Sequence, residues 1–74
     1  MKKPIVYSGT IYNYTVSAEY SNRDYGFPAI KLMYCTPTQY TYPITIILVP
    51  TVDIRSEEDL YLEISEYFED IKEL

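Results

Sequence analysis

The sequence of 74 residues lacks histidine and tryptophan, and it has one cysteine (Cys35) and two glycines (Gly9 and Gly26). Without histidine, both a Ser-His-Asp or Cys-His catalytic arrangement and a Cys/His zinc site are excluded. Two distant glycines cannot form a phosphate-binding loop. Cys35 falls in a predicted strand with no histidine to activate it, so we interpret it as a small buried hydrophobe. We expect no catalytic residue, no metal site and no cofactor.

Long hydrophobic runs are also missing. No apolar stretch approaches the ~18 residues of a membrane span, and the run that follows Lys2 and Lys3 stops at Ser8, too early for a secretory signal. We therefore expect no membrane association and a reduced, cytoplasmic setting. Ten tyrosines and nine isoleucines against two alanines indicate a low-GC genome. A virus, phage or mobile element fits that bias, and the setting is then the host cytoplasm.

The length predicts a single domain over residues 1–74. A chain this short buries only roughly 60% of its unfolded surface, and it has neither a disulfide nor a zinc site to stabilise it. Its hydrophobic content of 47% is nevertheless too high for a disordered chain. We expect a homodimer, because an open sheet in a small domain leaves strand edges that can pair.

Alternating apolar and polar residues predict strands in the first half of the chain. The expected strands cover about residues 4–8, 11–20, 29–36 and 43–49. The apolar parity changes after Ile11, and a two-residue hairpin turn at Ser8-Gly9 would account for the change. One long bent strand is the alternative. The run Ile44–Val49 is nearly all apolar and β-branched, which is typical of a strand buried on both faces.

The second half predicts a helix over about residues 56–73. Ser56 is a good N-cap, with Asp59 in a capping-box-like position. An apolar stripe recurs at helical spacing and consists of Leu60, Ile64, Tyr67, Phe68, Ile71 and Leu74. The expected fold class is α+β, with a small three- to four-stranded, mostly antiparallel sheet and one C-terminal amphipathic helix packed on one face.

The charge is divided between the two halves. Residues 1–55 carry five basic and three acidic groups, or +2, whereas residues 56–74 carry eight acidic groups and Lys72, or −7. On a helical wheel the face opposite the apolar stripe consists of Glu58, Leu62, Glu66, Glu69 and Glu73. Along one flank lie Asp59, Glu63 and Asp70. The face is either a solvated surface or a docking surface for a basic partner.

Two further features suggest recognition. Leu62 lies among carboxylates, where it is either an ordinary exposed leucine or an anchor for a partner's pocket, joined by Tyr61 at the edge of the stripe. The tyrosines Tyr25, Tyr40 and Tyr42 fall in the predicted loops 22–28 and 36–43. Tyrosine is favoured in binding loops, although rings that pack on their own loop are the alternative.

These features favour a small protein-binding module, an inhibitor or adaptor that occludes a partner protein with a basic surface. In one version of this hypothesis the acidic helix acts as a nucleic-acid mimic. A self-associating structural or assembly protein is the alternative, and a small-ligand carrier is a further one. The acidic total and the scattered basic groups argue against direct nucleic-acid binding.

Overall fold

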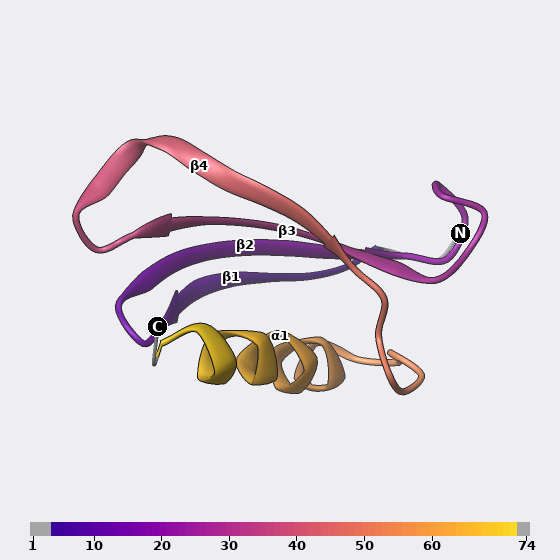
Figure 1. Ribbon diagram of the computed structural model, residues 1–74. Coiled ribbons are helices and arrows are strands. Elements are labelled where there is room, and N and C mark those ends of the chain that lie inside the picture. The colour runs from indigo at the N-terminus through magenta and orange to yellow at the C-terminus, as the bar shows by residue number, and fades with distance from the viewer. Residues whose placement is uncertain (1–3, 73–74) are drawn as a thin grey trace.

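The computed structural model describes residues 4–72, with only the backbone described for residues 39–41. Within that range the elements are β1 (Ile5–Ile11), β2 (Tyr14–Ser21), β3 (Ala29–Thr36), β4 (Gln39–Leu48) and α1 (Glu57–Ile71). The strands form one antiparallel sheet in the order β1-β2-β3-β4. Helix α1 lies along β1, and β4 forms the edge farther from the helix (Figure 1). The expected α+β fold class is confirmed.

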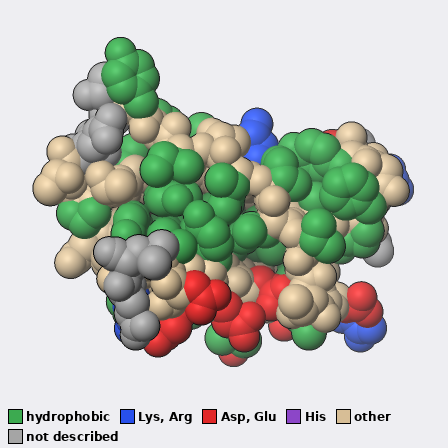
Figure 2. Space-filling view, in the orientation of Figure 1, with side chains coloured by type: hydrophobic (Ala, Val, Ile, Leu, Met, Phe, Trp, Pro, Cys, Tyr) green, Lys and Arg blue, Asp and Glu red, His purple; other side chains and the backbone are tan. Residues whose placement is uncertain are grey.

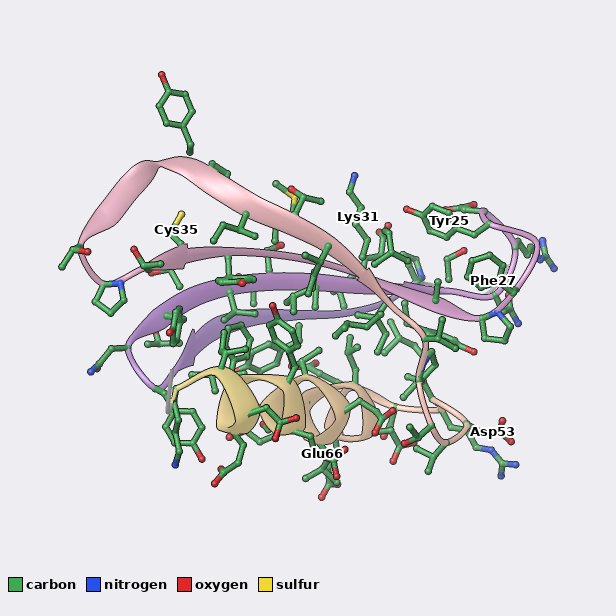
Figure 3. The ribbon with its side chains drawn as sticks, viewed as in Figure 1. Tyr25, Phe27, Lys31, Cys35, Asp53 and Glu66 are labelled. Carbon is green, nitrogen blue, oxygen red and sulfur yellow. The ribbon has the colours of Figure 1, made fainter. Side chains whose placement is uncertain are left out.

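The strand register places an apolar row from each of the four strands on the side of the helix. One row across the sheet consists of Tyr7, Ala18, Leu32 and Ile46. Paired residues of antiparallel strands point to the same face, and their chain neighbours point to the other. Lys31, next to Leu32, accordingly points away from α1 (Figure 3). The sheet therefore has one face under the helix and one bare face.

Phe68 is the centre of the core and is fully buried. Its ring centroid lies 5.1 Å from those of Tyr14 and Tyr34 and 5.4 Å from that of Tyr67. The hydroxyls of Tyr34 and Tyr67 are hydrogen-bonded at 2.9 Å. Burial, followed by this hydrogen bond, raises the pKa of Tyr34 to about 12. The aromatic cluster thus joins α1 to β2 and β3 through ring packing and one satisfied polar contact.

The helix begins as its sequence predicts. The Ser56 hydroxyl accepts a hydrogen bond of 3.2 Å from the backbone N–H of Asp59, and the Asp59 carboxylate accepts one of 3.0 Å from the N–H of Arg55. The first contact satisfies a backbone donor that the first helical turn leaves unpaired, and the second ties the residue before the N-cap to that turn. The acids of that turn also lie where the helix dipole favours negative charge.

The predicted hairpin turn at Ser8-Gly9 is wrong, because both residues lie inside β1. The turn is Tyr12-Asn13, with Ile11 paired to Tyr14 and with positive φ angles of 47° and 74° at the two turn residues. Positive φ at both central positions is the mark of the type I′ turn, which matches the twist of hairpin strands. This turn also produces the observed change of parity.

The expectation that Ile44–Val49 is buried on both faces is also wrong. Strand β4 is an edge strand that begins at Gln39, and Ile44 and Ile47 are each 43% exposed. Pro43 had marked the end of a loop in the sequence. An edge strand tolerates proline, however, because one row of its backbone groups pairs with no other strand. Tyr40 and Tyr42 therefore lie in a strand, not in a loop.

We predict that Phe68→Ala lowers the free energy of unfolding by about 3–5 kcal/mol, because it leaves a cavity among the three tyrosines. The matched change on the outer face of the same helix, Leu62→Ala, should stay within about 0.5 kcal/mol. Urea denaturation followed by circular dichroism measures both. Equal losses in the two variants would contradict the orientation of α1.

Candidate functional site

The outer face of α1 presents three of the residues that the sequence predicted. Glu58, Leu62 and Glu66 are exposed, with Leu62 at 55%. Figure 3 shows Glu66 on the side of α1 away from the sheet. Glu73 lies outside the described residues. The leucine among carboxylates is therefore a real surface feature, and its use by a partner stays a prediction.

Glu69 differs from Glu58 and Glu66 because it makes contacts with neighbouring side chains. It accepts a hydrogen bond of 2.6 Å from the hydroxyl of Tyr12, in the β1–β2 turn, and lies 3.3 Å from the ammonium of Lys72. That ammonium is also 4.4 Å from the centre of the Tyr12 ring. The bond from Tyr12, followed by Lys72, lowers the pKa of Glu69, and the same bond raises the pKa of Tyr12. Glu69 thus connects the end of the helix to the hairpin turn.

Glu63 also makes an internal contact. Its carboxylate accepts hydrogen bonds from the backbone N–H of Thr51 at 2.6 Å and from the Thr51 hydroxyl at 3.1 Å. This contact fixes the connection that leads from β4 to the helix. Within residues 4–72, the acids of α1 with no hydrogen bond or ion pair to another described residue are Glu57, Glu58, Glu66 and Asp70.

The predicted tyrosines do not converge on one site. The ring of Tyr61 packs against Tyr7 of β1, with centroids 5.3 Å apart. Tyr25 lies beside Phe27 in the β2–β3 connection, with centroids 6.1 Å apart (Figure 3). Tyr42 is 74% exposed on β4, and the side chain of Tyr40 lies outside the described part. Each tyrosine therefore has to be considered separately.

A groove of about 200 Å³ lies between α1 and the end of β4. Strand residues and the following connection form one side and the floor, with Ile30, Leu48, Val49, Pro50 and Thr51. The flank of the helix forms the other side, with Glu63, Glu66, Tyr67 and Asp70. Figure 2 shows hydrophobic side chains gathered above a border of acidic ones along the helix. The groove therefore combines an apolar floor with an acidic wall.

Sequence reasoning placed Glu63 and Asp70 on one flank of the helix but did not find the groove. Its floor depends on β4 being an edge strand that the helix does not cover. The signal in the sequence was the lack of any charged residue between Lys31 and Asp53. The sequence analysis used only the apolar, β-branched run Ile44–Val49, which it interpreted as a strand buried on both faces, whereas this run lies in an uncharged strand at the surface.

A second hollow of about 200 Å³ lies on the bare face of the sheet, with Ser17, Met33, Cys35 and Pro43 in its lining. It is wide open and has no charged side chain in its wall. The described residues contain no group of three or more acidic or cysteine side chains placed to hold a metal ion.

Between residues 4 and 72, no helix has the length and apolar character needed to cross a membrane. No protein family model, no curated protein and no solved structure matches the chain. The groove and the exposed residues around it must therefore be interpreted from their own chemistry.

We predict that Tyr12→Phe raises the pKa of Glu69 toward its usual value of 4.5, because the mutation removes the hydrogen bond that favours the carboxylate. The folded-state pKa of Glu69 is lowered, so the contact stabilises the fold above the unfolded-state pKa. That stabilisation is lost as the pH falls through the lower folded-state value. A carboxyl-carbon NMR titration measures the shift. Tyr42→Phe is the control, and an unchanged Glu69 in Tyr12→Phe would rule out the contact.

Proposed function

We propose that this chain is a small protein-binding module that occludes a partner protein by holding one of its segments in the groove between α1 and β4. The observation that carries the proposal is the apolar floor, with Ile30 and Leu48, beside a helix flank that bears Glu66 and Asp70. An exposed apolar patch with a polar rim is typical of an interaction site. A segment with Lys or Arg next to Leu, Ile or Phe has the complementary chemistry.

The two parts of the groove contribute differently to binding. Apolar side chains that enter the groove would supply most of the affinity, whereas the carboxylates would raise the association rate and fix the orientation. Glu66 and Asp70 are one helical turn apart, about 5–6 Å. Neither is paired with another described residue, so a basic partner binds them without breaking an internal contact.

Leu62 and Glu58 extend this surface around the helix. A partner long enough to pass over Glu66 would reach Leu62, which is exposed beside it. We assign Leu62 the role of a second anchor. Tyr25 is packed beside Phe27 at the β2–β3 connection and takes no part in the groove.

Three other functions receive less support. A nucleic-acid mimic needs an uninterrupted row of available carboxylates, whereas Asp59, Glu63 and Glu69 make internal contacts. A small-ligand carrier is disfavoured by size, because both hollows are about 200 Å³ and ligand pockets are usually about 300–1,000 Å³. Binding is favoured over catalysis because the sequence has no histidine, and the groove offers only carboxylates, a tyrosine and the hydroxyl of Thr51, which is bonded to Glu63.

The test is selection of a random peptide library displayed on phage against the immobilised protein. We expect the selected peptides to combine Lys or Arg with large apolar residues, and their binding to weaken as salt is raised. The double variant Glu66→Lys, Asp70→Lys should lose at least about tenfold in affinity, since it replaces two attractive contacts by repulsive ones.

Asp24→Lys and Asp53→Lys together are the control, because they make the same change of net charge at exposed loop positions away from the groove lining. These variants should bind within about twofold of the original. An equal loss of affinity in both double variants would show that the effect comes from net charge and not from the groove. Selected peptides without basic residues would overturn the assignment of the acidic wall.

A further inference from the structure

Strand β4 is an unprotected edge. Its apolar residues are exposed on both faces, with Ile44 and Ile47 each 43% exposed and Val49, just beyond the strand, 68% exposed. No charged residue occurs between Lys31 and Asp53. Natural sheets usually guard their edges with charged side chains, prolines, bulges or a covering element. Pro43 and the irregular pairing near Thr36 interrupt the first part of β4, whereas the segment Ile44–Leu48 is uncharged and apolar and has no such guard. This segment can pair with a partner strand.

The opposite edge of the same sheet lies next to the helix. Helix α1 lies along β1 (Figure 1), and the ring of Tyr61 packs on Tyr7 of that strand. The two edges of the sheet therefore differ, because the helix lies beside β1 and not beside β4. Pairing of β4 with β4 around a two-fold axis uses this edge once in each chain, so the assembly closes at two copies.

We propose that β4 pairs antiparallel with β4 of a second copy, so that two sheets join into one eight-stranded sheet around a two-fold axis. The second copy is the occupant that the charge pattern fits. Each chain carries −5 overall, and its acidic groups are concentrated in residues 56–74. An uncharged strand at the far edge of the sheet lets two such chains meet without bringing like charges together at the contact.

The register of this pairing follows from symmetry. Directly opposed residues of antiparallel strands face the same side, so a two-fold axis must pass through a residue paired with its own copy. An axis at Ile46 opposes Ile44 to Leu48 of the second copy on the helix side. It also opposes Thr45 to Ile47 of the second copy on the bare side. A five-residue segment centred on Thr45 would instead contain Pro43, and one centred on Ile47 would contain Val49, which lies beyond the end of β4.

The size of the contact sets the expected strength. A standard interface buries about 800 Å² per partner, roughly one seventh of the 5466 Å² that this chain exposes. Five paired residues do not reach that area alone. In the register centred on Ile46, Tyr42 lies opposite Pro50 of the second copy and Val49 opposite Pro43, which extends the contact at both ends. We expect a reversible dimer that dissociates on dilution.

The test is sedimentation velocity over about two decades of protein concentration, at low and at high salt. The original chain should shift toward the dimer as concentration rises. The dimer should be retained or strengthened by salt, because salt screens the repulsion between two chains of like charge. Binding of a basic segment in the groove has the opposite salt dependence, so the two proposals succeed or fail separately.

Ile47→Glu should abolish the dimer, because the new carboxylate replaces an apolar contact at the junction. Within one chain it lies beside Lys31, its register partner on β3, so the fold is maintained. Val6→Lys is the matched control, since it places an exposed charge on β1, the opposite edge strand, next to the opposite charge of Glu19 on β2. This control should dimerise like the original chain, and circular dichroism checks that both variants are folded.

The register has its own test. Adding Thr45→Lys to Ile47→Glu places two pairs of opposite charges across an axis at Ile46. The double variant should therefore have an association constant at least about tenfold higher than Ile47→Glu alone. A strict monomer at all concentrations, or a dimer unaffected by Ile47→Glu, would overturn the proposal. If Ile47→Glu fails to fold, Thr45→Glu takes its place. The sedimentation of the original chain at increasing concentration still decides whether a dimer forms.

Discussion

The width of one helix is the constraint on which the rest of this structure depends. An α-helix with its side chains is about 10–12 Å across, and four strands spaced about 4.8 Å apart make a wider surface. Helix α1 therefore cannot cover both edges of the sheet. It lies toward β1, with Phe68 among the rings of Tyr14 and Tyr34. The groove and the open β4 edge are both consequences of this offset.

The sequence predicted those elements whose local pattern and tertiary role agree. The bounds of β3 were expected at 29–36 and are Ala29–Thr36, and the helix begins after its expected N-cap, Ser56. In contrast, Tyr12 was assigned to a strand because its apolar ring continued an alternation. A two-residue turn with positive φ at both positions prefers Asn, Asp or Gly, and Tyr12 departs from that preference. Asn13 alone was therefore too weak a signal for the turn.

The site was harder to predict than the fold because exposure depends on strand order. The run Ile44–Val49 has the same composition whether it lies in the centre or at the edge of a sheet. Only the order β1-β2-β3-β4 makes it an edge. Similarly, the helical wheel placed Glu69 next to Glu66, but it could not show that the Tyr12 hydroxyl binds Glu69 and leaves Glu66 available.

The uncharged residues 32–52 and the acidic residues 56–74 contribute different parts of one surface in the folded chain. Because the helix is offset, its acidic flank borders the apolar surface that it fails to cover, and the groove forms at that border. Pairing of two β4 edges would set Ile44 of the second copy opposite Leu48 on the helix side, so the contact would lie directly beside the groove. In such a dimer the apolar floors of the two grooves would lie next to each other, with one acidic helix on either side. A partner that is itself two-fold symmetric, and that carries one segment with basic and apolar residues in each half, would then be bound by both grooves at once. Two linked contacts of modest strength would then give tight overall binding, as the proposed occlusion of a larger protein requires.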